Sequence, residues 1–144
     1  MKIDFGRATL AGVIGTAVMT VIGLYGAPLM GLPAMNPAEM LAGAMGGNLV
    51  IGWVAHFMIG IILAVGYAVV AGAVPGPAAL GGALYGLAPF LLAQVAVMPM
   101  MGMPLFSGSV SMALGSLVGH LVYGGIVGAV YGLGPAARAA RAEA

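Results

Sequence analysis

The sequence predicts an all-α fold: an integral-membrane four-helix bundle built from two tandem helical hairpins with pseudo-two-fold symmetry along the membrane normal. Two observations support this prediction, an apolar composition and short motifs that recur in the two halves of the chain. Of the 144 residues, 62% are hydrophobic and 5% are charged, against about 25% charged residues in an ordinary soluble domain. Between residues 8 and 137, Glu39 alone has a formal charge. The length fits a single transmembrane domain over residues 1–144.

Four apolar stretches are long enough to cross a bilayer. A helix that rises about 1.5 Å per residue needs about 20 residues to span about 30 Å of hydrocarbon. The stretches that meet this requirement are residues 8–31, 49–71, 78–98 and 110–133. Because the number of spans is even, we expect both chain termini on the same side of the membrane.

The basic residues indicate which side that is. Lys2, Arg7, Arg138 and Arg141 all lie close to the two termini. An excess of Lys and Arg marks the segments that stay in the cytoplasm. We therefore expect cytoplasmic termini, with the connections 32–48 and 99–109 on the outer face.

A short surface helix over residues 37–46 is expected within the first outer connection. Asn36 suits the N-cap, Pro37 suits the first helical position, and Glu39 stands where a capping box places its acidic partner. We favour this structural role for Glu39 over a role at the mouth of a site.

The two halves of the chain share several motifs. Residues 28–33 (PLMGLP) recur as residues 99–104 (PMMGMP), at the outer ends of the first and third spans. A histidine followed by Gly at +4 and Tyr at +11 occurs in the second and fourth spans: His56, Gly60 and Tyr67, then His120, Gly124 and Tyr131. At about 100° per residue these positions share one helix face. The chain therefore resembles two copies of one helical hairpin.

The two histidines are the leading candidate site. Ionisable residues inside a membrane usually face a partner, a cavity or a cofactor, and the symmetry would place the two imidazoles opposite each other. Small residues such as Gly60 and Gly124 would leave room for a bis-histidine haem b. The alternative, which we favour, is structural: the glycines close the helix packing, and each neutral histidine hydrogen-bonds a backbone carbonyl or Gln94.

Methionine suggests another site. Nine of the twelve methionines lie at or near the expected outer face: Met30, Met35, Met40, Met45, Met98, Met100, Met101, Met103 and Met112. Thioether ligands favour Cu(I). The candidate metal ligands are His56, His120, Met100 and Met101. Methionine also fills gaps in apolar packing, which is its commoner role.

Several classes of function are excluded or disfavoured. With no cysteine there is no disulfide, thiolate metal site or dithiol relay. Four cations confined to the ends provide no basic surface for nucleic acid. The spans contain no carboxylate pair, no Ser–His–acid set and no phosphate-binding glycine loop followed by Lys. We therefore expect a protein that is not an enzyme.

Five segments together resemble an uncharacterised family of small four-span bacterial membrane proteins. They are 28–33 (PxMGxP), 36–41 (NPxEML), 52–60 (GWVAHFMIG), 97–102 (VMPMMG) and 119–124 (GHLVYG). The resemblance covers nearly the whole chain and implies a location in the bacterial inner membrane, but no activity.

These observations lead to three functional hypotheses. The first is a non-catalytic accessory or assembly subunit of a larger respiratory or photosynthetic membrane complex, whose partners are lipid and other membrane subunits or further copies of this chain. The abundance of small residues on the helices suits packing against other proteins. The second is a haem b-binding or copper-handling protein that uses His56 and His120, and the third is a small proton or metal transporter.

Overall fold

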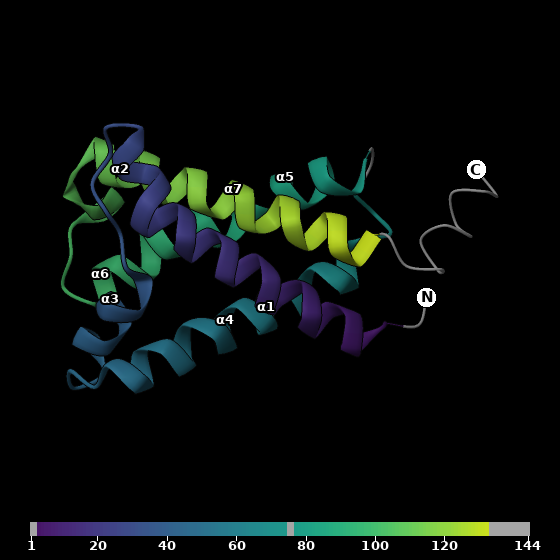
Figure 1. Ribbon diagram of the computed structural model, residues 1–144, viewed down its shortest axis with the longest axis horizontal. Helices are drawn as coiled ribbons and strands as arrows, with labels where there is room; N and C mark the ends of the chain where they lie inside the picture. The colour runs from purple at the N-terminus through teal and green to yellow at the C-terminus, as the bar shows by residue number, and fades with distance from the viewer. Residues whose placement is uncertain (1–2, 75–76, 133–144) are drawn as a thin grey trace.

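The computed structural model describes residues 3–74 and 77–132, and all regular elements in this part of the chain are helical (Figure 1). In chain order they are α1 (Phe5–Val21), the π-helical η1 (Ile22–Gly26), α2 (Ala27–Leu29), α3 (Pro37–Ala44), α4 (Leu49–Val70), α5 (Ala78–Leu92), the π-helical η2 (Ala93–Val97), α6 (Met98–Met100), the 3-10 helix η3 (Leu105–Gly108) and α7 (Val110–Gly132). The all-α prediction is therefore confirmed.

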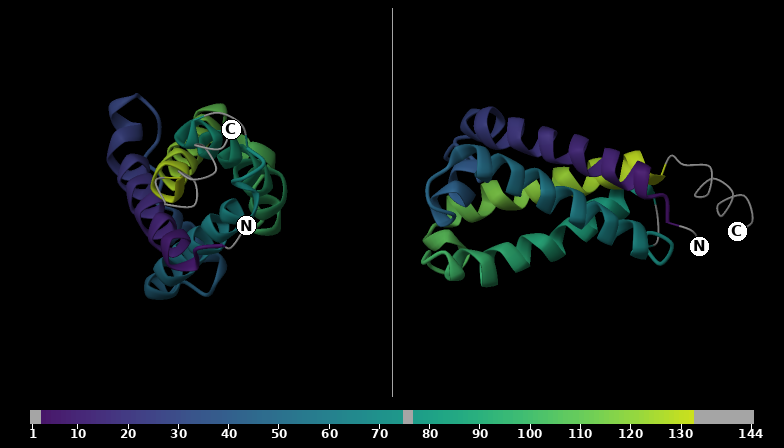
Figure 2. Two further views of the ribbon diagram at one scale, coloured as in Figure 1. Left: turned by 90° about the vertical axis from the view of Figure 1, so that its right-hand side faces the viewer. Right: turned by 90° about the horizontal axis from the view of Figure 1, so that it is seen from below.

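Four helices are long and apolar enough to cross a membrane. They run over Phe5–Leu29, Leu49–Val70, Ala78–Met100 and Val110–Gly132. Their ends differ by less than one helical turn from the ranges expected from hydropathy. Figure 2 shows that all four run along the long axis of the molecule. The start of α1, the end of α7 and the α4–α5 turn lie at one end, here called the terminal end (Figure 1). The opposite end, with α2, α3 and α6, is the α3 end.

The four long helices do not pack equally against one another. The contact between α5 and α7 is the most extensive, and α1 packs on both α4 and α7. The contacts between α4 and α5 are few, and Tyr85 provides one of them by donating a hydrogen bond to the Leu63 carbonyl at 2.8 Å. A two-fold axis relating the hairpins would make the α1–α7 and α4–α5 seams equivalent. The predicted pseudo-symmetry therefore stays a prediction, and these two seams differ.

Glycine lets the closest helices approach backbone to backbone. A Cβ on Gly82 of α5 would overlap the Gly124 carbonyl of α7 and lie 2.7 Å from the Gly128 Cα. A Cβ on Gly12 of α1 would lie 2.8 Å from the Ile61 Cα of α4. Packing of this kind, by small residues, is how helices associate in lipid.

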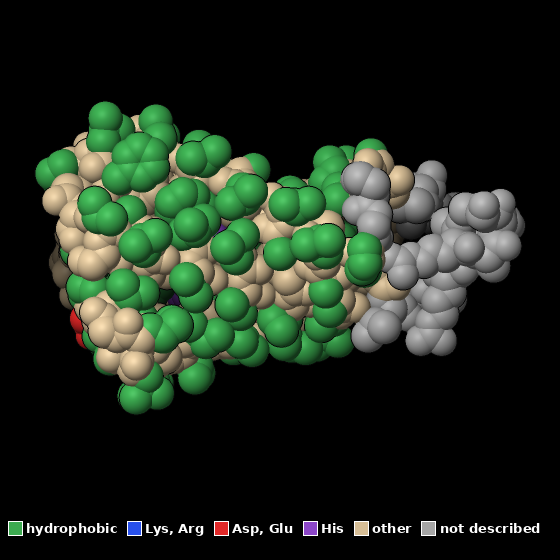
Figure 3. All heavy atoms as spheres, turned by 90° about the horizontal axis from the view of Figure 1, so that it is seen from above, with side chains coloured by type: hydrophobic (Ala, Val, Ile, Leu, Met, Phe, Trp, Pro, Cys, Tyr) green, Lys and Arg blue, Asp and Glu red, His purple; other side chains and the backbone are tan. Residues whose placement is uncertain are grey.

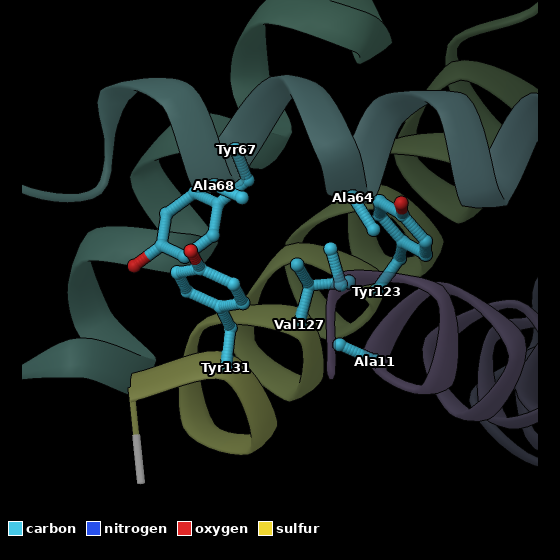
Figure 4. Close-up of a cluster of buried hydrophobic side chains, with 8 residues drawn as sticks. Ala11, Ala64, Tyr67, Ala68, Tyr123, Val127 and Tyr131 are labelled. Carbon is cyan, nitrogen blue, oxygen red and sulfur yellow. The ribbon is translucent and has the colours of Figure 1, made fainter. Parts of the chain in front are cut away.

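The hydrophobic core fills the half of the bundle toward the terminal end. Figure 4 shows alanines of α1 and α4 beside Tyr123 and Val127 of α7, and Tyr67 of α4 beside Tyr131 of α7. Its buried members are Ala8, Ala11, Ala64, Tyr67, Ala68, Tyr123, Val127 and Tyr131. At the edge of this core, Arg7 Nε donates to the Val130 carbonyl at 2.8 Å, which satisfies a carbonyl in the last turn of α7.

Proline explains the π-helical turns in the first and third spans. Proline has no N–H, and its ring collides with the carbonyl four residues earlier in a regular α-helix. A wider π turn avoids this collision, and one lies just before each of Pro28 and Pro99. The Ala27 N–H bonds the Ile22 carbonyl, and the Met98 N–H bonds the Ala93 carbonyl. Each helix then ends one residue after its proline, at Leu29 and at Met100. Gly31 (φ 75°) and Gly102 (φ 79°) follow two residues later and turn the chain away in the left-handed region, as glycine allows.

The short helix α3 lies close to α4 at the α3 end. The Asn36 side chain accepts hydrogen bonds from the Ala38 and Glu39 backbone N–H groups at 3.1 and 3.4 Å, as an N-cap does. A Cβ on Gly52 of α4 would overlap the Ala38 carbonyl. Glu39 is exposed, and in the described chain its side chain makes no return bond to Asn36. The cap therefore forms without the reciprocal half of the expected capping box.

The outer surface of the helices is apolar. On the face drawn in Figure 3, hydrophobic side chains and backbone cover nearly all the described area, and histidine is visible only between them. Large side chains that project outward include Val54, Ile62, Leu84 and Leu92, each more than half exposed. Such a surface suits a hydrocarbon environment better than water.

Candidate functional site

A cavity of about 190 Å³ lies in the half of the bundle toward the α3 end. All four long helices contribute to its wall, and α3 covers one side with Pro37, Met40 and Leu41. Its polar side chains are Thr16, His56, Gln94, Ser116, His120 and Tyr123. The cavity is therefore mostly apolar with a few polar groups, the usual character of a small-molecule or ion site.

The structure brings His56 of α4 and His120 of α7 to this one cavity. The side chain of His56 is buried and that of His120 is half-buried. The predicted inward orientation is thus observed, whereas a ligand-binding role for the pair stays a prediction.

Hydrogen bonds assign the protonated nitrogen of His56. The Thr20 hydroxyl lies 3.0 Å from His56 Nε2 and donates its proton to the Thr16 carbonyl at 2.7 Å. Because this hydroxyl has a single proton, it accepts from His56, so Nε2 bears the hydrogen of the neutral ring. Nδ1 of His56 is then an unprotonated nitrogen, and in the described chain it has no hydrogen-bond partner.

The same reasoning gives the opposite tautomer for His120. Its Nδ1 lies 2.8 Å from the Ser116 carbonyl, which can only accept, so Nδ1 bears the hydrogen and Nε2 is unprotonated. The described residues offer no hydrogen bond to Nε2. Each imidazole is therefore fixed through one nitrogen and keeps a lone pair on the other, the arrangement typical of a histidine metal ligand.

Of the two partners expected for the histidines, a backbone carbonyl or Gln94, His120 has the carbonyl of Ser116, and Gln94 bonds neither histidine. Its amide nitrogen donates to the Ser116 hydroxyl at 3.0 Å, and its carbonyl oxygen accepts from Ser107 at 2.9 Å. Gln94 thus links the cavity wall to the loop before α7. The physical reason is reach, because Ser116 stands one turn before His120 and intercepts the amide.

Aromatic rings surround both imidazoles. The ring centroids of Trp53 and Phe57 lie 6.3 and 6.0 Å from that of His56. Phe90 meets His120 edge-on at 5.8 Å. These contacts limit the rotation of the rings, so the two unprotonated nitrogens are held in fixed positions.

Five methionines line the same cavity: Met19, Met35, Met40, Met98 and Met101. Two of them lie against glycines of α7. A Cβ on Gly115 would be 3.2 Å from Met35 Sδ, and a Cβ on Gly119 would be 3.4 Å from the terminal carbon of Met19. Glycine at these two positions therefore makes room for thioether side chains next to His120.

Three of the sequence-predicted site residues need correction or refinement. Gly124 lies in the α5–α7 contact, where a Cβ would meet Gly82 backbone, and it is not part of the cavity wall. Met100 is 85% exposed and points away from the cavity, because it follows Pro99 on the outer side of α6. Gly60 does line the cavity, but its Cβ position is filled by Thr16 of α1, so it serves helix packing. Met101 lines the cavity as expected.

The cavity does not fit a haem. Pockets for drug-sized ligands have volumes of about 300–1,000 Å³, and a cavity of about 150 Å³ holds benzene. The observed volume of about 190 Å³ is closer to the second figure. The cavity wall also contains no Lys or Arg to pair with haem propionates. A macrocycle would therefore require the helices to separate.

Sequence reasoning missed several residues of this site. Met19 lies within the first span and was not grouped with the methionines of the outer face. Thr16 and Thr20 were not singled out, although two threonines four residues apart in an apolar helix share one face and could have been found. The Thr16 hydroxyl is buried without a hydrogen-bond partner and lines the cavity.

The fold and the cavity define a small all-helical protein with four helices able to span a membrane, an architecture compatible with a multi-pass membrane protein. The chain belongs to the family of unknown function DUF6789, whose family model matches residues 3–141. The resemblance to an uncharacterised family of four-span proteins is thereby confirmed. No curated protein and no solved structure matches the chain.

Proposed function

We propose that this protein is a copper-handling membrane protein that binds Cu(I) in the cavity between its helices. The observation that supports the proposal is the set of side chains that line the cavity. Two imidazoles with unprotonated nitrogens and five methionine thioethers line the same space of about 190 Å³. Soft thioether ligands together with imidazole favour Cu(I) over harder cations.

The charge of the site supports a monovalent ion. A cation in a medium of low dielectric constant loses hydration energy, and the loss grows steeply with charge. The cavity wall contains no carboxylate or thiolate that would neutralise a divalent ion. Among the described residues there is also no cluster of three or more His, Asp or Glu. Neutral imidazole and thioether ligands are sufficient for Cu(I), whereas Zn²⁺ sites are built from Cys, His, Asp and Glu and not from thioethers, and Mg²⁺ requires oxygen ligands.

In this proposal His56 Nδ1 and His120 Nε2 bind the metal, and thioethers complete its coordination. Thr20 and Ser116 orient the two rings through hydrogen bonds to their protonated nitrogens. Both ligands bind as neutral groups, so loading releases no proton. The protein binds and passes on an ion without catalysing a reaction.

The test is a Cu(I) titration of the detergent-purified protein under reducing conditions, in competition with a chromophoric Cu(I) chelator. We expect one tightly bound Cu(I) per chain and X-ray absorption spectra with both nitrogen and sulfur ligands. The paired substitutions His56→Leu and His120→Leu should remove the nitrogen ligands. Loss of a residue that only orients a metal ligand lowers metal affinity by about 10–100-fold. Loss of the two histidine ligands should lower the Cu(I) affinity by more than this.

Met58→Leu and Met100→Leu are matched controls, because both side chains are more than half exposed and neither lines the cavity. They should leave the Cu(I) affinity unchanged. Circular dichroism and gel filtration would verify that each variant keeps its helices. A wild-type protein that takes up no stoichiometric Cu(I) would refute the proposal.

For cellular location we propose the bacterial inner membrane with cytoplasmic termini, supported by the basic residues near both chain ends. This orientation would put the α3 end, where the methionines gather, on the outer face. A role as an accessory or assembly subunit stays a prediction. It is consistent with copper handling, because an assembly subunit could deliver the ion to another membrane protein.

A further inference from the structure

A second hollow opens at the α3 end, beside the cavity. It is lined by α3, the segment before it, the loop after α6 and the start of α7. Five of its residues are methionines: Met35, Met40, Met101, Met103 and Met112. We call it the outer methionine hollow. Three of the five, Met35, Met40 and Met101, also line the cavity with the two histidines.

The shared methionines connect the two spaces, because each of the three lines both. Met103 and Met112 are found only in the outer hollow, and Met19 and Met98 only in the cavity. All seven side chains are half-buried, so none of them is enclosed in tightly packed core. Methionine is unbranched and flexible, which allows a thioether to follow an ion over a short distance.

Glu39 gives this hollow a charge that the cavity lacks. It lines the hollow, its side chain is exposed, and it is the only formally charged residue between residues 8 and 137. A carboxylate at the mouth attracts cations from solution, and electrostatic attraction of this kind raises association rates. Because the Asn36 cap forms without the Glu39 side chain, this carboxylate at the third residue of α3 is free to act on cations in solution.

We infer that the outer methionine hollow is the entry site for Cu(I), from which the ion passes along the thioethers to the histidine cavity. This inference rests on the proposed function. The transfer is a series of ligand exchanges in which a new Cu–S bond forms before an old one breaks, first at Met103 or Met112, then at the shared methionines. Copper remains Cu(I), and no proton or electron moves because every ligand is neutral.

The test measures the rate of loading separately from the amount loaded. Cu(I) is supplied to the full-length protein as its cationic acetonitrile complex, and the Cu(I) not yet bound is trapped with bicinchoninate at set times after rapid mixing and measured by its colour. The variant Met103→Leu with Met112→Leu should load several-fold more slowly than wild type yet reach the same Cu(I) content. Methionine and leucine are close in volume, so the packing should change little.

Two further variants sharpen the test. Glu39→Gln should also slow loading, and the slowing should fade at high salt, because screening removes the attraction. The control pair Met58→Leu and Met100→Leu should load at the wild-type rate. Because this control keeps the number of substituted methionines equal, a difference between the two double variants would identify the hollow as the route.

The outcomes separate the two proposals. If Met103→Leu with Met112→Leu loads as fast as wild type, the entry route is wrong while copper binding in the cavity stands. If that variant loses bound Cu(I) at equilibrium, the hollow holds the ion instead of admitting it, and the route is again wrong. If wild type binds no Cu(I), the proposed function fails and the route fails with it.

Discussion

The two halves of the bundle are made by the same four helices but differ in how they are filled. Toward the terminal end, Gly82, Gly124 and Gly128 bring the backbones of α5 and α7 together, and tyrosines and alanines fill the remaining core (Figure 4). Toward the α3 end the helices contain π turns and bear methionine and histidine, and they line a cavity. In apolar helices, side-chain size and helix irregularity thus decide where space remains.

Polar groups differ between the halves in the same way. In the half toward the terminal end, here called the closed half, tyrosine hydroxyls donate hydrogen bonds to backbone carbonyls. Tyr123 bonds the Gly60 carbonyl, and Tyr85 bonds the Leu63 carbonyl. In the half with the cavity, each imidazole retains one unprotonated nitrogen, and the Thr16 hydroxyl has no partner. Unsatisfied buried polar groups cost free energy. One such group, the Thr16 hydroxyl, lines the cavity together with the two imidazoles, which favours a role in binding over a role in packing.

The largest expected effect comes from adding one methyl group to the closed half. In Gly82→Ala the new Cβ would overlap the Gly124 carbonyl and crowd the Gly128 backbone. Backbone cannot rotate away, so α5 and α7 must separate, and we expect destabilisation of about 3 kcal/mol, the upper end of ordinary overpacking costs. Unfolding in a detergent–SDS mixture, followed by circular dichroism, measures the change.

Gly43→Ala is the matched control for this substitution. Gly43 lies in α3, where a Cβ would have no atom within 4 Å. Alanine is the better helix former, by roughly 0.5–1 kcal/mol, so this variant should be as stable as wild type or slightly more so. Equal losses in both variants would mean that the α5–α7 contact is not the basis of the closed half.

An intermediate effect is expected at the cavity wall. Gln94→Leu keeps the volume of the side chain but removes its bonds to Ser107 and Ser116. Ser107 is buried and has φ of 60°, next to Phe106 with φ of 52°, a conformation that side-chain-bearing residues adopt only at a cost. We expect a loss of about 2 kcal/mol from the unsatisfied hydroxyls and faster chymotrypsin cleavage at Phe106.

Val95→Leu on the same turn serves as the control, because Val95 is 51% exposed. Its stability should stay within about 0.5 kcal/mol of wild type. If Gln94→Leu leaves the protease sensitivity of the loop unchanged, then the backbone of residues 105–108 is held by its own packing and not by the amide.

Hydropathy and capping patterns were sufficient to predict the helices. A stretch of about twenty mostly apolar residues predicts both ends of a membrane-spanning helix to within one helical turn. Asn36 followed by Pro37 marks the start of α3 correctly. The spacing of His56 and His120 within their spans also placed both on the inner face. These features depend on local sequence, so a single chain is enough to find them.

The site itself could be predicted only in part, because tertiary contacts decide which side chains share a space. Met100 and Met101 are neighbours in sequence, yet one faces outward and the other lines the cavity. The π turns before Pro28 and Pro99 rotate the helix ends, which a regular helix of 3.6 residues per turn does not anticipate. Gly60 and Gly124 share a motif, yet only Gly60 lines the cavity.

The smallest expected effect lies at the boundary between the two halves. Tyr123 of α7 lines the cavity and donates a hydrogen bond to the Gly60 carbonyl of α4 at 2.5 Å. Tyr123→Phe removes this bond and keeps the ring, so we expect a loss of about 1 kcal/mol, the usual net value of one hydrogen bond. Tyr25→Phe, at a side chain that is 68% exposed, should change nothing measurable in the same unfolding assay. If the stability of Tyr123→Phe equals that of wild type, apolar contacts of the ring alone join α7 to α4 at this position. The closed half then does not depend on this hydrogen bond.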